Sequence, residues 1–160
     1  MLYIGPELGL RNEEIEKHKL ETEKKFGSLD YHLLYAQDVS VGEVISLLQG
    51  GSLFAEARFV VLRNAELIKN KEDIEILLNW INGIKSQKYD DAYLFLVSDE
   101  TSVDKKLENL IPKENKQIFW EMFDDRKIPW LKNFFNKNGY KIEDDACETI
   151  LNLIENNTEA

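Results

Sequence analysis

The sequence predicts an α/β fold, a parallel β-sheet flanked by helices, on the basis of two observations. As far as about residue 124, short apolar runs alternate with stretches of helical periodicity, an alternation that is typical of doubly wound sheets. The runs Phe59–Leu62 and Tyr93–Val97 are apolar without the alternation of a half-buried strand. Such continuous runs indicate strands that are covered on both faces, as in a parallel sheet between two helical layers.

Short apolar runs predict the strands of this sheet. They are Leu2–Ile4, Phe59–Leu62, Ala92–Val97 and Gln117–Trp120, and Tyr31–Tyr35 is a weaker candidate.

Helices are expected between these strands. Apolar side chains recur at helical spacing in two segments, with Val41, Val44, Ile45 and Leu48 in the first and Ile74, Leu77, Leu78, Ile81 and Ile84 in the second. Residues 10–25 carry many charges and few apolar side chains, which favours a mostly solvated helix. Asp104–Leu110 is expected to form a short helix that ends near Pro112.

After about Asp124 the pattern is helical only. Pro129 is expected in the first turn of a helix and Gly139 at the C-terminal cap of that helix. Glu143–Ile154 carries apolar residues at helical spacing. We therefore expect an α/β domain over residues 1–124 and the start of a helical domain over residues 125–160. Because no further helix follows to complete that domain, we expect the chain to be truncated.

Composition excludes several classes of function. The chain has 160 residues and a net charge of -10, and a surface this acidic repels phosphate backbones, so tight nucleic-acid binding by the chain alone is not expected. Cys147 is the single cysteine, which excludes an internal disulfide framework and a cysteine-rich zinc site. No apolar run approaches the ~18 residues of a membrane span and no signal-peptide pattern opens the chain, so a cytoplasmic location is expected.

The segment after the first strand lacks the features of a phosphate-binding loop. Residues 5–12 contain neither a Gly-Lys-Ser/Thr ending nor a Gly-x-Gly-x-x-Gly spacing. Pro6 removes a backbone donor, and Glu7 brings a negative charge to the place of the phosphate. After the third strand, Arg63 and Asn64 stand where an ATPase has the acidic pair that holds magnesium. ATP hydrolysis and a phospho-acceptor receiver domain are therefore not expected.

Other candidate chemical groups favour structural interpretations. His18 and His32 fall in a charged helix and a weak strand, which does not favour a metal pair. Cys147 lies beside the apolar side of the last helix, where a small buried side chain is expected. Acidic residues flank the Ala92–Val97 strand, namely Asp90, Asp91, Asp99 and Glu100. They could bind a cation or act as acid and base, although solvated loop ends are the favoured interpretation.

The segment Gln49–Glu56 differs from routine core sequence. The preceding helix is expected to end at Gly50 and Gly51, and Leu53 and Phe54 follow before the next strand begins near Arg58. Two adjacent large apolar residues on a glycine-hinged connection can form a protruding knob that fits a partner's pocket. The alternative is that Phe54 folds back onto the sheet.

Around this segment the sequence resembles the delta subunit of the bacterial DNA polymerase III clamp loader. The central match is Gln49-x-x-Ser52-Leu53-Phe54, followed by an apolar strand that ends in Arg-Asn-Ala-Glu at residues 63–66. Further matches occur in the order of the family, namely Gly5 with Glu7 and Leu10, Asp104–Leu107, and Pro129–Leu131 leading to Gly139 and Ile142.

The resemblance implies a fold and a role without catalysis. The implied fold is an AAA+ ATPase-like domain with a degenerate nucleotide site, followed by a helical lid and a collar, of which this chain would cover the first domain and two helices of the lid. The implied role is to bind the ring-shaped sliding clamp (beta subunit) and open it within the DNA polymerase III holoenzyme, a nucleotidyltransferase assembly. No active site, cofactor or metal is implied. The other implied partners are the delta-prime and gamma/tau subunits, with DNA reached only through the assembled loader and no membrane.

The resemblance also implies site residues. Leu53 and Phe54 would fill an apolar pocket on the clamp, while Gln49 and Ser52 would fix register by hydrogen bonds. The helix Val41–Leu48 would present the wedge to the clamp interface. Gly50 and Gly51 stand where the family can carry a bulkier residue, a difference that would weaken binding or loosen the wedge.

Two alternatives remain open from the sequence. One is a small α/β enzyme or ligand-binding domain that uses Asp90, Asp91 and Asp99. The other is an ATPase-like interaction module with a different partner. Exposure of Leu53 and Phe54 would distinguish a clamp opener from an enzyme.

Overall fold

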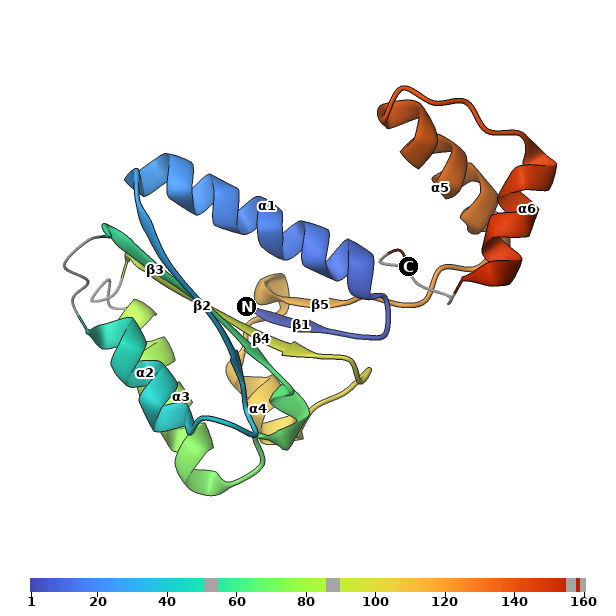
Figure 1. Ribbon diagram of the computed structural model, residues 1–160. Coiled ribbons are helices and arrows are strands. Elements are labelled where there is room, and N and C mark those ends of the chain that lie inside the picture. Colours follow the sequence, from blue (N-terminus) through green and yellow to red (C-terminus); the bar gives the residue numbers. More distant parts are fainter. Residues whose placement is uncertain (51–54, 86–89, 155–157, 159–160) are drawn as a thin grey trace.

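The computed structural model describes residues 1–50, 55–85, 90–154 and 158 (Figure 1). Its centre is a five-stranded sheet in the order β2-β3-β4-β1-β5, and every strand pair is parallel. The strands are β1 Leu2–Ile4, β2 Leu29–Tyr35, β3 Ala57–Arg63, β4 Ala92–Ser98 and β5 Lys116–Ile118. The predicted α/β class and parallel sheet are therefore confirmed.

The strand boundaries differ from the predicted ones mainly at the edges of the sheet. The weak candidate at Tyr31–Tyr35 is a full strand that begins at Leu29 and pairs with β3 along its whole length, from Leu29 opposite Ala57 to Tyr35 opposite Arg63. Pairing with a buried neighbour thus extends β2 beyond its apolar part. The last strand ends at Ile118 instead of Trp120, because its partner β1 ends opposite that residue.

Helices lie on both faces of the sheet (Figure 1). Helix α1 covers one face, whereas α2, α3 and α4 cover the other. The helical elements are α1 Leu8–Phe26, α2 Val41–Gln49, η1 Ala65–Leu67, α3 Lys71–Lys85, α4 Lys105–Leu110, η2 Lys113–Asn115, α5 Asp124–Lys137 and α6 Asp144–Leu153. The expected helices are thus all present, with ends that move by a few residues.

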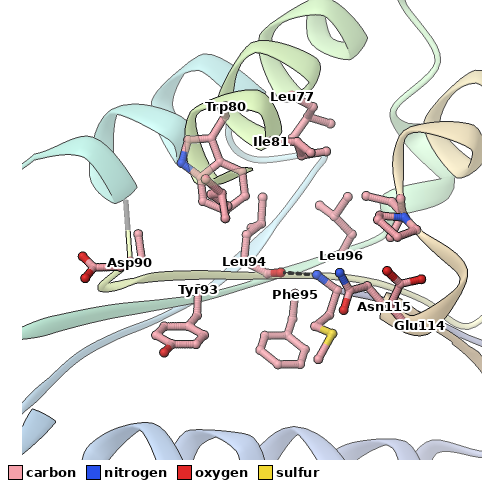
Figure 2. A pocket seen from close by; sticks show the side chains of 15 residues that line it. Leu77, Trp80, Ile81, Asp90, Tyr93, Leu94, Phe95, Leu96, Glu114 and Asn115 are labelled. Carbon is pink, nitrogen blue, oxygen red and sulfur yellow. Dashed lines mark hydrogen bonds between the residues drawn. The ribbon is translucent and has the colours of Figure 1, made fainter. Parts of the chain in front are cut away.

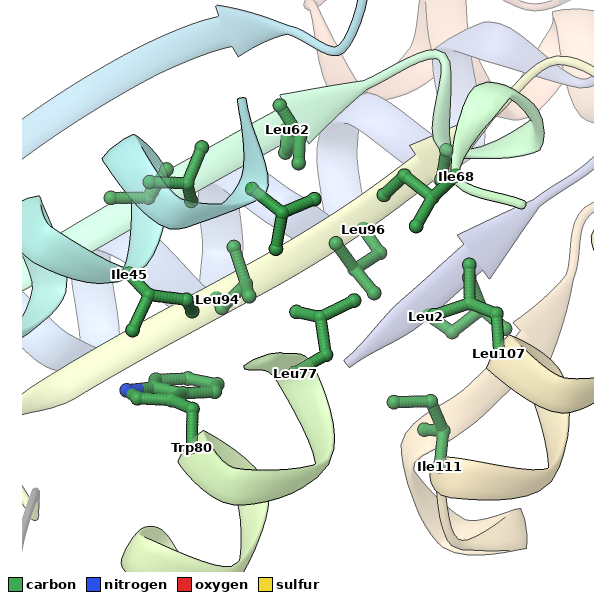
Figure 3. Close-up of a cluster of buried hydrophobic side chains, with 14 of the residues drawn as sticks. Leu2, Ile45, Leu62, Ile68, Leu77, Trp80, Leu94, Leu96, Leu107 and Ile111 are labelled. Carbon is green, nitrogen blue, oxygen red and sulfur yellow. The ribbon is translucent and has the colours of Figure 1, made fainter. Parts of the chain in front are cut away.

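Each face of the sheet has its own hydrophobic core. The larger core lies under α2, α3 and α4 and includes Leu62, Leu77 and Leu96 (Figure 3). The smaller core lies under α1, where Phe59 stacks on Phe95 with ring centroids 4.8 Å apart. Burial of each such side chain contributes ~1.5–3 kcal/mol. The uninterrupted apolar runs of β3 and β4 are explained by these two cores.

Helix α3 buries a partly different set of side chains from the predicted stripe. Leu78 was expected in the core but is exposed, whereas Trp80 is buried. The reason is geometric, because successive helical residues are rotated by about 100°. Leu78 lies off the line through Ile74, Leu77 and Ile81, and Trp80 has a ring large enough to reach the sheet from the edge of that line.

Helix α5 begins earlier than predicted. Pro129 was expected in its first turn, but the helix starts at Asp124 and Pro129 lies inside it. Asp124 and Asp125 occupy the first turn, where carboxylates interact favourably with the helix dipole. Gly139 follows the C-terminal cap residue Asn138 with a left-handed φ of 82°, close to the predicted cap.

Helices α5 and α6 pack against each other away from the sheet (Figure 1). Lys132 of α5 forms an ion pair with Asp144 at the start of α6. Cys147 on α6 is fully buried, as expected for a small apolar side chain. Ala146, which was counted with the apolar positions of this helix, is exposed.

Candidate functional site

The side chain of Arg11 fills the space at the carboxyl ends of β1 and β4, which we call the edge where these strands end. This residue lies in the first turn of α1 and has no solvent-exposed surface. Its Nη1 donates to the carbonyl oxygens of Gly5 (2.9 Å) and Ser98 (2.8 Å), and its Nη2 donates to Asp99 Oδ1 (2.7 Å). After β1 the chain crosses to β2 at one side of the sheet, and after β4 it crosses to β5 at the other side. In open α/β sheets such a point is where ligands bind, and here a cationic side chain of the protein occupies it.

The loop that follows β1 is held closed. Gly5 has φ +119°, and a Cβ built on it would lie 2.2 Å from the carbonyl oxygen of Phe119, so β1 ends in close contact with the backbone after β5. Glu7 is fully buried. Its Oε1 accepts hydrogen bonds from the backbone N–H (2.6 Å) and Oγ1 (2.5 Å) of Thr158. The carboxylate expected near a phosphate position is therefore directed into the protein's own contacts.

The residues after β3 join the same polar network. Arg63 Nη2 donates to Asn12 Oδ1 of α1 (3.3 Å), and Asn64 adopts a left-handed φ of 60°. Glu66 accepts from Asn64 Nδ2 at one carboxylate oxygen (3.2 Å) and from Ser98 Oγ at the other (2.5 Å). Glu66 closes the Arg-Asn-Ala-Glu match, but its contact with Ser98 was not predicted, because Ser98 lies on a different strand. These contacts tie β3, β4 and α1 together at this edge.

The carboxylates of the enzyme alternative do not form one site. Asp90 and Asp91 precede β4, while Asp99 follows it. A seven-residue strand separates the two ends by roughly 20 Å at ~3.3 Å per residue. Asp91 pairs with Arg58 and Asp99 pairs with Arg11. The geometry therefore does not favour a shared acid–base pair or cation site.

The two histidines are not brought together either. His18 Nε2 on α1 lies 3.0 Å from Tyr3 Oη, and His32 Nε2 on β2 lies 3.0 Å from Asp30 Oδ1. Burial and the nearby Glu14 carboxylate raise the pKa of Tyr3 to about 12, so its hydroxyl remains protonated near neutral pH. Within the described residues, no group of three or more His, Cys, Asp and Glu side chains is arranged to hold a metal ion.

Helix α2 ends at the segment that was predicted to bind a partner. Its start is fixed by a capping box, in which Glu43 N–H donates to Ser40 Oγ (3.3 Å) and Ser40 N–H donates to a Glu43 carboxylate oxygen (2.7 Å). The Ser40 backbone and hydroxyl hydrogen bonds lower the pKa of Glu43. At the other end, the N–H of Gly50 donates to Ser46 O (2.8 Å), and the extended backbone of Gly50 (φ -64°, ψ 144°) ends the helix after Gln49.

Of the four predicted site residues, Gln49 is described. It is the last residue of α2 and is exposed. Ser52, Leu53 and Phe54 lie outside the described residues. The expected apolar face of α2, formed by Val41, Val44, Ile45 and Leu48, is buried under the sheet and is not free to contact a partner.

Leu47 is a candidate contact residue that the sequence analysis missed. Its side chain is 41% exposed, although its neighbour Leu48 is completely buried. Leu47 and Gln49 both remain accessible near the end of α2. The exposure of Leu47 could have been predicted from the sequence, because Leu47 does not fall on the i, i+3, i+4, i+7 stripe of this helix.

A cavity of about 480 Å³ lies at the edge where β1 and β4 begin, between β4 and α3 (Figure 2). Its walls are mostly apolar and include Leu77, Trp80 and Leu94. The amino group of Met1 donates to Leu94 O (2.8 Å), and burial lowers the pKa of this amine to about 5. The indole N–H of Trp80 has no hydrogen-bond partner among the described residues.

No protein-family model matches the sequence, and no curated protein gives a significant sequence match. In contrast, the structure is similar to the DNA clamp loader delta protein (YqeN) of Bacillus subtilis, with a TM-score of 0.62 and 17% sequence identity. The similarity covers 99% of this chain and 49% of that protein. No helix within the described part of the chain combines the length and apolar character needed to cross a membrane. The resemblance inferred from the sequence is confirmed at the level of the fold, which this chain shares with a clamp loader delta protein along nearly all its length while spanning about half of that protein.

Proposed function

We propose that this chain is part of a clamp-loader delta subunit that binds the ring-shaped sliding clamp and opens it during DNA replication. The observation that carries the proposal is the fold shared with a clamp loader delta protein over 99% of the chain. It is supported by the position of Gln49, which is exposed at the end of α2 immediately before the segment with the Ser-Leu-Phe sequence.

In the proposed complex, Leu53 and Phe54 occupy an apolar pocket on the clamp. Gln49 and Ser52 fix their register by hydrogen bonds, and α2 acts as the wedge against the clamp interface. The exposed side chain of Leu47 adds an apolar contact on the outward face of this helix. Adjacent Gly50 and Gly51 contribute no side chains, so the affinity depends on few residues.

The proposed contribution is mechanical. The buried Arg11 guanidinium occupies the edge of the sheet where a nucleotide would bind, which supports a subunit without ATP hydrolysis or cofactor. Calorimetry is expected to detect no ATP binding at ligand concentrations up to about 1 mM. A dissociation constant of that size corresponds to a binding free energy of only ~4 kcal/mol. The subunit would work in the bacterial cytoplasm within the DNA polymerase III holoenzyme, whose nucleotidyltransferase activity resides in other subunits.

We also propose a division of the chain. Residues 1–124 would form the AAA+-like domain, and residues 125–160 would form part of the helical lid. Contacts with the delta-prime and gamma/tau subunits, and with DNA, would require the assembled loader. The separation of α5 and α6 from the sheet in Figure 1 supports this division.

The decisive experiment measures binding of the 160-residue chain to the sliding clamp of the same organism by surface plasmon resonance. Replacing both Leu53 and Phe54 with Ala should lower the affinity by about two to four powers of ten, since burial of each side chain in a partner pocket is worth ~1.5–3 kcal/mol. The melting temperature should stay near that of the wild type if these residues lie outside the sheet core.

A matched control replaces Phe123 and Tyr140 with Ala, because their side chains are 70% and 66% exposed elsewhere on the chain. This variant should bind the clamp normally. Failure of the wild-type chain to bind would contradict the proposed function and would favour an interaction module with another partner. A double Ala variant at positions 53 and 54 that melts early would instead assign those residues to the core.

A further inference from the structure

We propose that Arg58 and Asp91 position the end of helix α2, and with it Gln49, for contact with the partner. The inference rests on the proposed function, since it concerns the same binding surface. Arg58 is the second residue of β3, and Asp91 immediately precedes β4. From the sequence, Arg58 was expected only at the start of the strand that matches the family. Asp91 was expected at a solvated loop end or, in the enzyme alternative, in a carboxylate site.

The guanidinium of Arg58 joins two connections at one edge of the sheet. Its Nη1 donates to the carbonyl oxygen of Gly50, the residue that caps α2, and its Nη2 forms an ion pair with Asp91 Oδ2. The backbone N–H of Arg58 also donates to the carbonyl oxygen of Asp91 (2.8 Å). The side chains of Arg58 and Asp91 are 11% and 33% exposed. The end of α2 is thus tied to the start of β4 through a largely buried side chain.

Arginine is suited to this position for two physical reasons. The carboxyl end of a helix carries partial negative charge on its unpaired carbonyl groups, which a cation stabilises. In addition, the planar guanidinium presents several donors in a fixed fork and serves two acceptors simultaneously, whereas the lysine ammonium acts as a point charge. Asp91 supplies the negative charge that compensates for burial of the guanidinium.

A second pair of contacts holds the chain on the other side of residues 51–54. The hydroxyl oxygen of Ser28, just before β2, accepts from the N–H of Glu56 (2.9 Å), and its carbonyl oxygen accepts from the N–H of Ala57 (3.3 Å). The described residues on both sides of residues 51–54 are therefore bonded to neighbouring parts of the sheet. Arg58 provides the contact that reaches Gly50, next to Gln49.

Because Arg58 already holds the end of α2, this end needs less ordering when the partner binds. A side chain on a helix end that is already oriented loses less conformational entropy on association than one on a loose end. When the competent orientation is populated only in part, the apparent affinity falls by that fraction. Loss of the Arg58 contact should therefore weaken binding even though Arg58 itself does not touch the partner.

The test compares Arg58→Gln, Asp91→Asn and the double variant by clamp-binding kinetics well below their melting temperatures. Arg58→Gln should lose about tenfold in affinity through a slower association rate, with the dissociation rate nearly unchanged, because the competent population falls. Asp91→Asn should lose less, since the contact with Gly50 remains. The double variant should be no worse than Arg58→Gln, because both substitutions act through one shared contact.

Arg63→Gln is the matched control. Arg63 lies at the opposite end of the same strand, where it contacts Asn12, so its replacement should leave clamp binding unchanged. The variant with Ala at positions 53 and 54 is measured in parallel and should dissociate faster, because it loses direct contacts.

The outcomes separate this inference from the proposed function. If the wild-type chain does not bind the clamp, the proposed function is wrong. If the wild type binds and the variant at positions 53 and 54 does not, a folded Arg58→Gln with wild-type association kinetics overturns the positioning role alone. Should Arg58→Gln fail to fold, Asp91→Asn decides the question, and its wild-type association rate would overturn the inference.

Discussion

Arg11 and Leu47 show how single side chains depart from what their residue type predicts. An arginine in a charged helix is normally solvated, yet Arg11 is fully buried because Gly5, Ser98 and Asp99 supply acceptors for its guanidinium. A leucine in a helix with a strong apolar stripe is normally buried, yet Leu47 lies off the stripe and is exposed. In both cases the position in the fold, and not the residue type, determines whether the side chain is buried. Both residues matter for the proposed function, Arg11 where a nucleotide would bind and Leu47 on the outward face of α2.

Replacing Arg11 with Met tests whether the guanidinium holds the edge of the sheet together. The substitution leaves the carbonyl oxygen of Gly5 without its donor, whereas Ser98 O still accepts from the backbone N–H of Gly5 (3.0 Å). Because a buried unsatisfied group costs ~1–3 kcal/mol, we expect urea denaturation to show a loss of about 1–3 kcal/mol. The control is Lys71→Met, which removes a cation whose side chain is 83% exposed on α3. Equal stability of the two variants would contradict the structural role of Arg11.

The buried amino group of Met1 predicts a pH dependence of stability. Burial lowers its pKa from 8.0 to about 5, so between these values the unfolded chain holds a proton that the folded chain releases. The contribution of this amine to the free energy of unfolding should therefore be fully present above pH 8 and should be lost as the pH falls toward 5. At ~1.4 kcal/mol per pKa unit, the total loss is about 4 kcal/mol at most.

Acetylation of this amine provides the comparison. The acetylated chain keeps an N–H that can donate to Leu94 O but has no titrating group at that position. Its stability, measured by urea denaturation from pH 8 to pH 5, should lack the amine's contribution to the slope. Identical slopes for the two forms would mean that the Met1 amine does not titrate as its burial indicates.

At the scale of elements, α2 combines a structural face with an accessible end. Its buried residues pack into the core under the sheet, while Leu47 and Gln49 remain accessible, close in sequence to the residues that are proposed to bind the partner. Gly50 ends the helix, and the Arg58 guanidinium holds that end at the start of β3. The helix is therefore fixed in place by one face, which leaves the other free to act as the proposed wedge.

Leu47 and Leu48 form a matched pair for testing this division of labour. Leu48→Ala should destabilise the fold by ~2–5 kcal/mol, as large-to-small core substitutions do. Leu47→Ala should change stability by less than ~0.5 kcal/mol but should weaken clamp binding about tenfold, in the range of a moderate interface contact. Thermal melting and equilibrium binding on both variants provide the measurements. Clamp binding by Leu47→Ala at wild-type affinity would remove this residue from the interface.

At the scale of the whole molecule, different contacts occupy the two ends of the parallel strands. The edge where β1, β3 and β4 end is filled by Arg11, Glu66 and their partners. The opposite edge, where β3 and β4 begin, carries the end of α2 and the Arg58–Asp91 pair. The proposed partner site lies at the end opposite to the one that Arg11 fills, so closure of that first end is compatible with the proposed role in binding.

The net charge of -10 predicts the behaviour of the whole chain toward DNA. Because binding to duplex DNA is driven mainly by neutralisation of phosphates, the isolated chain should bind primed DNA only weakly at physiological salt. Fluorescence anisotropy with a labelled primed duplex measures this. Tight binding that weakens steeply with added salt would reveal a basic surface and would contradict this prediction.

Local patterns in the sequence determined much of the architecture. The uninterrupted apolar runs of β3 and β4 predicted strands covered on both faces, and the stripe of α2 with its terminal glycines predicted that helix and its end. These features depend on the side chains of near neighbours in the chain, so they can be recognised without the fold. The same reasoning placed Leu78 in the core and Pro129 in a first turn, but Leu78 lies off the buried line of α3 and α5 begins five residues earlier, at Asp124.

The tertiary structure alone decided which polar groups meet. Arg11 and Ser98 are 87 residues apart, and Arg58 and Asp91 are 33 apart, yet both pairs are formed because parallel strands bring distant connections to a common edge of the sheet. Hydrophobic periodicity reports which face of an element is buried, but it does not report which loop will lie beside that element's end. The sequence by itself therefore determined the layers of this protein and the position of Gln49 at a helix end, whereas strand order determined that Arg11 closes one edge and that Arg58 and Asp91 hold the other.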